Sequence, residues 1–563
     1  MNNPFRPILI AAALLVSSCA TPQAEPGYDL VIRGGTIYDG KGGAPFTGDV
    51  GIRGDRIAAV GPRLAGRGAA EIDASGLAVA PGFINMLSWA NESLIADPHG
   101  QSDIRQGVTL EVMGEGESMG PWSDEMKRLE AGRQGDIKYR IEWTSLGDYL
   151  GYMERRGVST NIASFVGATT VRVHELGEGD VDPTPAQLAR MRALVRQAMN
   201  EGAMGVGSSL IYAPAYFAET PELVALAGEA GKCGGLYISH IRDEGPRLLE
   251  AIGELIEISE KSGAPAEIYH IKQSGRDNWG KIDAALARIE AARARGLRIT
   301  ADMYTYPASS TGFDAAMPLW VQEGGIEAWV RRLQEPATRA RLLAEMRSGQ
   351  GSENMKLVVR EPDKVILLAF KTERLKPLTG RTLADVARER GKSPEETAAD
   401  LIVEDGTRIQ VAYFGMSEDN VRREVALPWV SFGSDASSQA PQGVFLKSST
   451  HPRAYGNFAR LLGKYVRDEK IVPLQEAVRR LTGLPASNLG ITDRGILKAG
   501  NYADLAIFDP ATIRDNATFA QPQLYATGMR HVFVNGVAVL RDGEHTRNIP
   551  GRFVRGPGWN KCH

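Results

Sequence analysis

One pattern occurs at two places in the chain: Leu236-Tyr237-Ile238-Ser239-His240 and Ala266-Glu267-Ile268-Tyr269-His270. Each run is short, mostly apolar and closed by a histidine, which is typical of a buried strand with a polar side chain at its carboxyl end. An amphipathic segment from Pro246 to Ser262 separates the two runs and is predicted to be a helix. Strand, helix and strand in this order predict a βαβ unit with parallel strands.

The same alternation of strands and helices extends over residues 80–490. Eight strands are predicted to begin near Ala78, Val108, Asn161, Ala203, Leu236, Ala266, Arg298 and Val430. Eight such units favour an α/β fold of the TIM type, a closed (β/α)₈ barrel, in which the carboxyl ends of all strands meet at one mouth. His240 and His270 are therefore predicted to lie together there and to bind a metal ion, because imidazole is a frequent zinc ligand. The alternative is a pair of core histidines hydrogen-bonded at strand ends.

Two further regions flank or interrupt the predicted barrel. Residues 28–79 and 495–555 read as short strands joined by glycine-rich turns, and we expect both chain ends to form one small β-sandwich. Residues 320–414 are too many for a single βα connection. This stretch is predicted to be an inserted subdomain beside the pocket.

The first 19 residues are predicted to be a lipoprotein signal peptide. The apolar run Ile8–Val16 is too short to span a membrane, and small residues precede Cys19 as in a bacterial lipobox. A plain secretory signal is the alternative. We therefore expect an exported protein, in the periplasm or anchored to the outer membrane through Cys19. The spacing of Cys233 and Cys562 does not suggest a disulfide, and Cys233 is expected to be a small buried apolar residue.

The charge distribution limits the classes of partner. The 563 residues carry a net charge of −3 without a basic cluster, which argues against nucleic-acid binding. We expect a small-molecule substrate, and contact with a membrane only through the N-terminal lipid anchor. The sequence gives no indication of the oligomeric state.

Several motifs, taken in order, resemble one family. They are Ala80-Pro81-Gly82-Phe83-Ile84, the run Ser239–Gly245, Asp302-Met303-Tyr304-Thr305-Tyr306, Gly433-Ser434-Asp435, His451-Pro452-Arg453-Ala454-Tyr455-Gly456 and Tyr502–Asp509. Together they resemble the amidohydrolase superfamily and, within it, the N-acyl-D-amino-acid deacylases, also called D-aminoacylases. The resemblance implies metal binding by His240 and His270, and proton transfer by Asp435. A metal-bound water has a pKa of about 7, so it attacks an amide at neutral pH while a carboxylate accepts its proton.

The chain departs from the family pattern at two strand ends. The first strand normally ends in a His-x-His pair, but Leu87 and Trp89 stand at these positions. The second strand normally supplies a cysteine ligand, and here Gly116 takes its place with Glu115 beside it. We expect one tightly bound Zn²⁺ held by His240, His270 and Glu115. The alternative is a degenerate lipoprotein that binds small molecules without hydrolysing them.

The substrate implied by the resemblance carries a carboxylate next to its amide. Lys272 follows His270 by two residues, so it is expected on the same side of the strand, where its charge would orient this group. Arg453 and Tyr304 match positions that the family uses to bind it, with Tyr306 as the rival of Tyr304. The role of His451 is left open. The expected activity is hydrolysis of N-acyl-D-amino acids or similar small amides, and a related dipeptidase or cyclic-amide hydrolase is the alternative.

Overall fold

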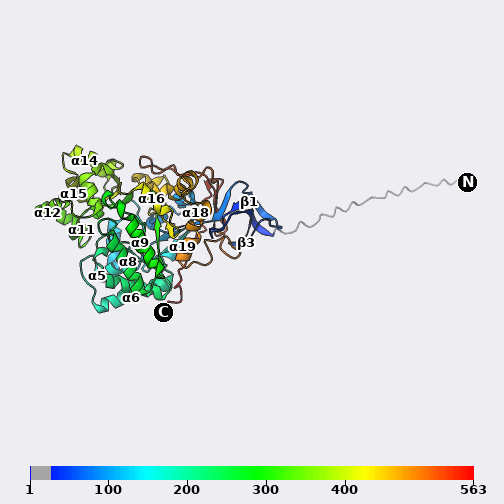
Figure 1. The fold of residues 1–563 in the computed structure, drawn as a ribbon, viewed down its shortest axis with the longest axis horizontal. Coiled ribbons are helices and arrows are strands. Elements are labelled where there is room, and N and C mark those ends of the chain that lie inside the picture. The colour runs from blue at the N-terminus through cyan, green and yellow to red at the C-terminus, as the bar shows by residue number, and fades with distance from the viewer. Residues whose placement is uncertain (2–26, 563) are drawn as a thin grey trace.

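The computed structural model describes Met1 and residues 27–562 (Figure 1). The predicted signal peptide and Cys19 lie outside these residues. Among the helices that the structure describes, none has both the length and the apolar character needed to cross a membrane. In Figure 1 the strands of the N-terminal end, β1 and β3, lie on one side of the helix-rich centre, and helices α11 to α15 lie on the opposite side.

Eight parallel strand positions form the central barrel. They are β6 (Phe83–Asn85), β7 (Val108–Met113), β8 (Asn161–Ser164) continued by β9 (Val166–Gly167), β10 (Gly205–Ser209), β11 (Leu236–His240), β12 (Ala266–Ile268), β13 (Ile299–Met303) and β17 (Val430–Phe432). Neighbouring strands pair in parallel. The barrel closes between β17 and β6, where the Met86 amide donates to the Phe432 carbonyl (3.2 Å) and the Asp435 amide to the Leu87 carbonyl (2.9 Å). The predicted TIM-like barrel is confirmed.

Helices connect the strands and cover the outside of the barrel. They are α1 (Ala90–Ala96), α2 (Gln101–Ile104), α3 (Asp124–Arg133), α4 (Leu146–Arg156), α5 (Ala168–Leu176), α6 (Pro185–Glu201), α7 (Thr220–Lys232), α8 (Leu248–Ser262), α9 (Ile282–Ala294), α16 (Glu418–Val425), α17 (Arg453–Arg460), α18 (Leu474–Leu481) and α19 (Gly483–Asn488). Helix α8 buries Leu248, Ile252 and Leu255, which recur every three or four residues and so form one apolar face. It ends at Gly263, whose φ of 72° is readily adopted only by glycine.

Both chain ends contribute to one nine-stranded sheet. The N-terminal end supplies β1 (Tyr28–Ile37), β2 (Phe46–Arg53), β3 (Arg56–Gly61), β4 (Gly68–Asp73) and β5 (Ala78–Pro81), and the C-terminal end supplies β18 (Leu505–Phe508), β19 (Met529–Val534), β20 (Val537–Arg541) and β21 (Glu544–His545). The two sets meet where β5 pairs antiparallel with β18. Ile32, Val50, Ile507 and Phe533 are buried in a common core between them. This core holds the two ends of the chain together.

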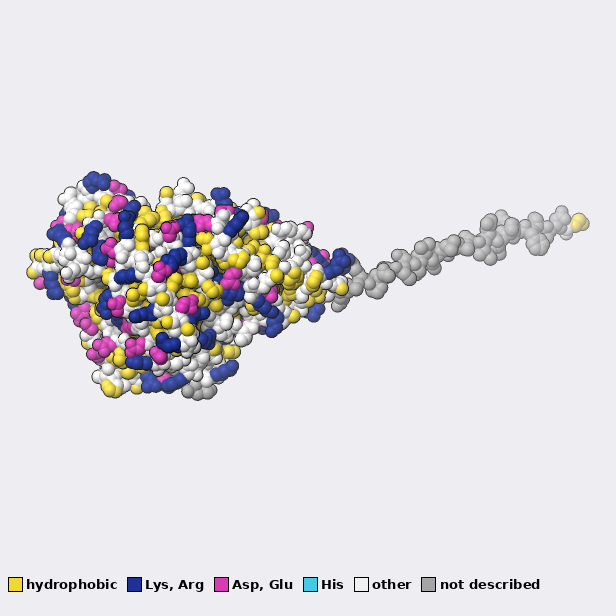
Figure 2. All heavy atoms as spheres, viewed as in Figure 1, with side chains coloured by type: hydrophobic (Ala, Val, Ile, Leu, Met, Phe, Trp, Pro, Cys, Tyr) yellow, Lys and Arg dark blue, Asp and Glu magenta, His cyan; other side chains and the backbone are white. Residues whose placement is uncertain are grey.

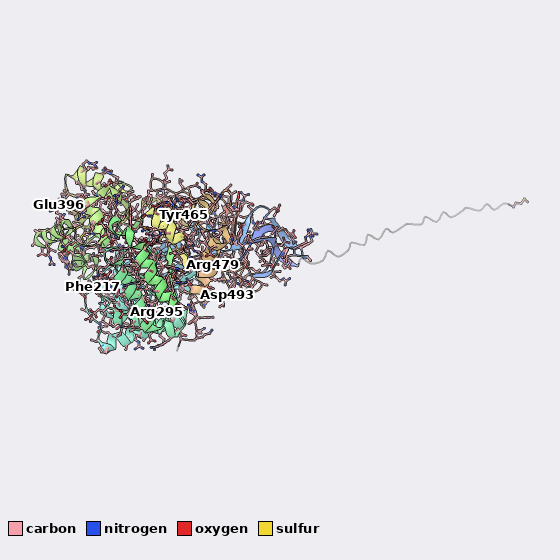
Figure 3. All side chains as sticks on the ribbon, viewed as in Figure 1. Phe217, Arg295, Glu396, Tyr465, Arg479 and Asp493 are labelled. Carbon is pink, nitrogen blue, oxygen red and sulfur yellow. A yellow bond between two sulfur atoms is a disulfide. The ribbon has the colours of Figure 1, made fainter. Side chains whose placement is uncertain are left out.

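The connection between β13 and β17 contains a separate subdomain. Its antiparallel sheet has the order β14 (Ser309–Gly312), β16 (Gln410–Tyr413), β15 (Val365–Ala369), and its helices are α10 (Leu319–Gln322), α11 (Gly325–Gln334), α12 (Pro336–Arg347), α13 (Glu353–Arg360), α14 (Leu383–Arg390) and α15 (Pro394–Asp405). Phe313, Trp329 and Leu367 belong to a core of its own. The subdomain begins before the predicted boundary at residue 320, because its strand β16 pairs with β14, which starts at Ser309. Glu396 of α15 marks the end of the molecule away from β1 (Figure 3).

A disulfide corrects the expectation for the cysteines. Cys233, which follows α7, is bonded to Cys562, with Cα atoms 5.3 Å apart across 329 residues of sequence. The C-terminal segment returns to this place, and the Asn560 amide donates to the Asn200 carbonyl of α6 (3.0 Å). The expectation that Cys233 is an unpaired apolar residue is therefore wrong. Two cysteines so distant in sequence give no spacing signal, since only the fold brings them within bonding range.

The surface agrees with the charge argument. Figure 2 shows Lys and Arg side chains interspersed with Asp and Glu over the visible face, without a concentrated positive area.

Candidate metal centre and active site

The structure brings the three predicted metal ligands together at the barrel mouth. Glu115 follows β7, His240 ends β11 and His270 lies two residues beyond β12, and all three are buried. His240 Nδ1 lies 3.2 Å and His270 Nε2 3.0 Å from Oε1 of Glu115. One donor atom from each residue falls within 4.8 Å of the others. Two imidazole nitrogens and one carboxylate oxygen fit a zinc site with three protein ligands.

Glu244 contacts the outer nitrogens of both histidines. Its carboxylate lies 3.6 Å from His240 Nε2 and 3.2 Å from His270 Nδ1, the nitrogens that face away from Glu115. Lys272 Nζ lies 2.6 Å from Glu244 Oε1 and 2.7 Å from His270 Nδ1. A carboxylate on the outer nitrogen fixes the orientation and tautomer of a metal-binding imidazole. Glu244 is therefore placed to orient the His270 ring, faces His240 only as a nearby charge beyond hydrogen-bond range, and is paired with Lys272.

The charges of the site perturb its titration. Burial works against ionisation of Glu115, yet the adjacent imidazoles of His270 and His240 lower its pKa below the usual range. Burial lowers the pKa of His240. For His270, burial and Lys272 act in the same lowering direction, but the carboxylates of Glu115 and Glu244 prevail and raise its pKa to about 10. Glu115 and His270 therefore stabilise each other's charged form.

Trp89 lies between the metal centre and Asp435. The indole Nε1 is 3.0 Å from Oε2 of Glu115 and 3.1 Å from Oδ1 of Asp435. Asp435, three residues beyond β17, has a left-handed backbone with φ 49°. This conformation is held by a hydrogen bond from the Asp435 amide to the Leu87 carbonyl. Burial raises the pKa of Asp435, and the ion pair with Arg453 opposes this rise. Asp435 therefore sits beside the metal ligands rather than at an unrelated turn.

Arg453 and Tyr304 lie next to Asp435. Arg453 Nη1 is 2.9 Å from Oδ2 of Asp435, and its guanidinium stacks 4.4 Å from the centre of the Tyr304 ring. The two residues left open are now placed. His451 accepts a hydrogen bond from the Arg453 amide through Nδ1 (3.0 Å), so it supports the loop that carries Arg453. Tyr306 donates to Asp515 (3.1 Å), which does not line the cavity.

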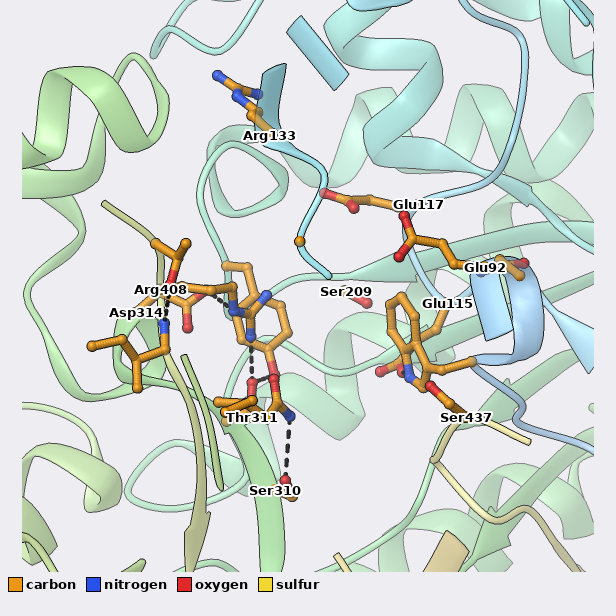
Figure 4. A pocket seen from close by; sticks show the side chains of 18 of the residues that line it. Glu92, Glu115, Glu117, Arg133, Ser209, Ser310, Thr311, Asp314, Arg408 and Ser437 are labelled. Atoms are coloured by element: carbon orange, nitrogen blue, oxygen red, sulfur yellow. Dashed lines mark hydrogen bonds and ion pairs between the residues drawn. The ribbon is translucent and has the colours of Figure 1, made fainter. Parts of the chain in front are cut away.

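One cavity of about 930 Å³ joins these residues to the inserted subdomain. Arg408 of the subdomain contacts Asp314 (3.2 Å) and lies over the ring of Tyr212, which in turn packs on His240 at 5.4 Å between ring centres. Glu92 and Glu117 lie across the cavity from Arg408 (Figure 4). The Arg408–Asp314 pair therefore stands on the subdomain side of the cavity, and the carboxyl groups of Glu92 and Glu117 stand on the other.

The sequence interpretation missed four contributors. Glu244 stands in the run Ser239–Gly245, so the motif that identified His240 could have drawn attention to it. Trp89 was noted in the sequence only because it stands where the family has a histidine. Tyr212 and Arg408 had no sequence signal, because long-range folding places them at the cavity. Trp89, Tyr212 and Arg408 are found by contact rather than by motif.

Comparison with known proteins agrees with this geometry. The model of the amidohydrolase family matches residues 70–540. D-aminoacylase from Alcaligenes xylosoxydans xylosoxydans is 33% identical over 94% of this chain and 97% of its own length. N-acyl-D-glutamate deacylase from the same organism is 32% identical over 94% and 96%.

Solved structures match over the same length. A crystal structure of D-aminoacylase is 31% identical, with a TM-score of 0.77 and coverage of 94% of this chain and 100% of that one. N-acyl-D-glutamate deacylase from Bordetella bronchiseptica, complexed with zinc and a phosphonate inhibitor, is 29% identical, with a TM-score of 0.76 and coverage of 94% and 99%. Another D-aminoacylase structure, with a TM-score of 0.77 at 31% identity and coverage of 94% and 100%, concerns a binuclear metal center with one-metal activation and second-metal attenuation. The chain belongs to the amidohydrolase family and, within it, to the N-acyl-D-amino-acid deacylases.

Proposed function

We propose that this protein hydrolyses the amide bond of N-acyl-D-amino acids in a metal-dependent reaction. The observation that carries the proposal is the joint placement of a three-ligand metal centre and the Asp435–Arg453 pair in one cavity. The relatives supply the substrate class and the D configuration, since their names specify both.

Glu115, His240 and His270 would hold one divalent ion, for which zinc suits the nitrogen and oxygen donors. A bound ion supplies Lewis-acid chemistry and lowers the pKa of water toward neutrality. Leu87 and Trp89 offer no ligand atom for a second ion. A stoichiometry of one ion per chain follows from this donor set.

Asp435 is proposed to accept the proton of the attacking water and return it to the leaving amine. Its carboxylate is held on both sides, by Trp89 at Oδ1 and Arg453 at Oδ2. Because burial raises its pKa, the carboxylate is a stronger base than an exposed one, so it accepts the proton of the water more readily and keeps it until the more basic leaving amine takes it. Fixed position and raised pKa both suit a proton shuttle.

Arg453 and Tyr304 are proposed to bind the substrate carboxylate, with Lys272 adding positive charge. Arg453 is already constrained by the Ser310 carbonyl (3.2 Å) and the Tyr304 ring, so little freedom is lost when it binds an anion. Lys272 faces Glu244 and His270, and a substrate would have to share its ammonium group with Glu244. Arg453 is likewise paired with Asp435, but its buried Nε has no hydrogen-bond partner among the described residues, so we assign the main anchoring role to Arg453.

A dipeptidase is the second candidate, and the carboxyl groups across the cavity favour it. Glu92, Glu117 and Glu130 line this wall. Tyr139 contacts Glu92 and Glu130 at 2.9 and 3.3 Å, and none of the three forms an ion pair with Lys or Arg among residues 27–562. Burial raises the pKa of all three. A free amino group on the acyl side of a dipeptide would complement these carboxylates.

We also propose export and lipid anchoring at Cys19. The Cys233–Cys562 disulfide supports a location outside the cytoplasm, since disulfides persist in oxidising compartments. Cys19→Ser should release the folded protein from the membrane fraction. A variant that stays membrane-bound would refute the anchor.

A substrate panel tests the activity. N-acetyl-D-leucine, N-acetyl-D-glutamate, their L enantiomers, a dipeptide ending in a D residue and a cyclic hydantoin should be compared by kcat/KM. The proposal predicts turnover of the N-acetyl-D compounds, with the L forms lower by at least about a hundredfold. Turnover of the dipeptide or the hydantoin alone would replace it by one of the two alternatives.

Arg453→Lys then tests the anchoring role. It should raise KM for N-acetyl-D-leucine by about tenfold or more and leave KM for the corresponding C-terminal amide nearly unchanged. Equal losses on both substrates would refute carboxylate binding by Arg453.

A further inference from the structure

The indole of Trp89 contacts both the candidate metal ligand Glu115 and the proposed proton acceptor Asp435, but it takes no part in the proton transfer itself. Its Nε1 faces Oε2 of Glu115 at 3.0 Å and Oδ1 of Asp435 at 3.1 Å. A single N–H is thus shared between two carboxylates that come from opposite sides of the point where the barrel closes. Such a shared donor fixes the separation of the two carboxylates as well as their orientation.

In both Glu115 and Asp435, one carboxylate oxygen faces Trp89 and the other faces a different partner. Oε1 of Glu115 faces the two histidines, and Oε2 faces Trp89. Oδ2 of Asp435 pairs with Arg453, and Oδ1 faces Trp89. Each carboxylate therefore gives one oxygen to the proposed chemistry and the other to the indole. A cation that bridged Oε2 and Oδ1 would have to displace the indole N–H.

The backbone around Trp89 is tied to both neighbouring strands. The Trp89 amide donates to the Ala436 carbonyl (3.0 Å), and the Ser88 amide donates to the Val112 carbonyl of β7 (2.9 Å). Leu87 is 1% exposed and packs in a core cluster of the barrel interior. The segment is thus held on both sides, so the ring has a defined place from which to direct its N–H.

We propose that Trp89 is a positioning residue that replaces a second metal ion, aligning Asp435 with the metal ligand Glu115 while closing the space to another cation. The inference rests on the proposed hydrolytic function. It explains why the chain retains Asp435 at the metal centre although positions 87 and 89 carry no ligand. A neutral N–H supplies partial positive charge between two carboxylates, so it can hold them together without adding a second Lewis acid.

Trp89→Phe tests the positioning role, because it keeps a ring and removes only the N–H. Zinc content after gel filtration, melting temperature, kcat and KM for N-acetyl-D-leucine should be measured. We expect one zinc per chain and a nearly unchanged KM, with kcat reduced by about tenfold or more, the scale of a lost hydrogen bond to a charged group. Trp320→Phe is the matched control, since Trp320 Nε1 also donates to a carboxylate, that of Glu345 (2.9 Å), in the inserted subdomain.

The replacement role is tested by Leu87→His combined with Trp89→His. Wild type should bind one zinc even in excess zinc, and the double variant should bind two, as measured by elemental analysis and titration calorimetry. Two zinc ions in wild type, or an unchanged kcat in Trp89→Phe while wild type is active with one zinc, would overturn the inference and leave the proposed function standing. A wild type that binds no zinc and hydrolyses no amide would overturn both.

Discussion

In the β11–β12 half of the barrel mouth, two histidines face the cavity and one carboxylate, Glu244, contacts the outer nitrogens of both rings. In the β6–β7 half, Leu87 and Trp89 stand where the family pattern has two histidines, and Gly116 stands where it has a cysteine, with Glu115 beside it. The first half provides nitrogen ligands with an ordered outer contact. The second provides a single oxygen ligand and a hydrogen-bond donor that joins it to Asp435. We therefore propose that the first half of the mouth binds the metal ion and that the second positions Asp435 for proton transfer.

The largest effect is expected when a histidine ligand of the proposed metal site is removed. His270→Asn should abolish tight zinc binding and lower turnover on the order of a thousandfold, because a metal ion contributes several kcal/mol of transition-state stabilisation. Elemental analysis and kcat measure the two effects. His174→Asn, a half-buried histidine of α5 outside the cavity, should change neither. A zinc-free but active His270→Asn protein would contradict the assignment.

The next largest effect is expected at Asp435, where a substitution separates proton transfer from metal binding. Asp435→Asn keeps the size of the side chain and a hydrogen-bonding oxygen but cannot accept a proton. Turnover should fall by about a hundredfold or more while one zinc remains bound. Asp515→Asn, which removes a carboxylate outside the cavity, serves as the control. Normal turnover of Asp435→Asn would rule out the proton-shuttle role.

A smaller effect is expected at Glu244, which faces the outer nitrogens of the two histidines. Glu244→Gln removes the charge that faces both outer nitrogens, and it should weaken zinc binding by about ten- to a hundredfold, as measured by competition with a chelator. Asp243→Asn is the matched control, because Asp243 instead accepts hydrogen bonds from the Gly245 and Arg247 amides. Equal zinc affinities in wild type and Glu244→Gln would show that Glu244 does not orient the rings.

The smallest effect concerns pH and the buried charges behind the histidine half. Burial raises the pKa of Glu424 to about 8, against the hydrogen bond from Gln273. Because this pKa lies above the unfolded value of about 4.3, the folded state binds the proton more tightly. The stabilisation is complete below pH 4.3 and is lost as pH rises through 8. Glu424→Gln should match the wild-type melting temperature at pH 4 and exceed it by about 2 °C at pH 8.5. A constant difference at both pH values would contradict the raised pKa.

The sequence predicted the features that repeat or form motifs. Eight strand–helix units defined the barrel, and the two strand-end histidines located the mouth. The family resemblance then indicated Asp435 and Arg453, which the structure places 2.9 Å apart. The contacts of Trp89 and Glu244 were not predictable, because each depends on the relative orientation of side chains from different strands or loops. The Cys233–Cys562 disulfide was hidden for a similar reason, since its partners are 329 residues apart.

We propose that one metal ion, held by Glu115, His240 and His270, suffices for hydrolysis. Chelator-treated protein should be titrated with zinc while the initial rate on N-acetyl-D-leucine is recorded. We expect no turnover without metal, and full activity at one equivalent of zinc per chain with no further change at higher equivalents. Activity that persists in the metal-free protein, or that rises until two equivalents are bound, would contradict it.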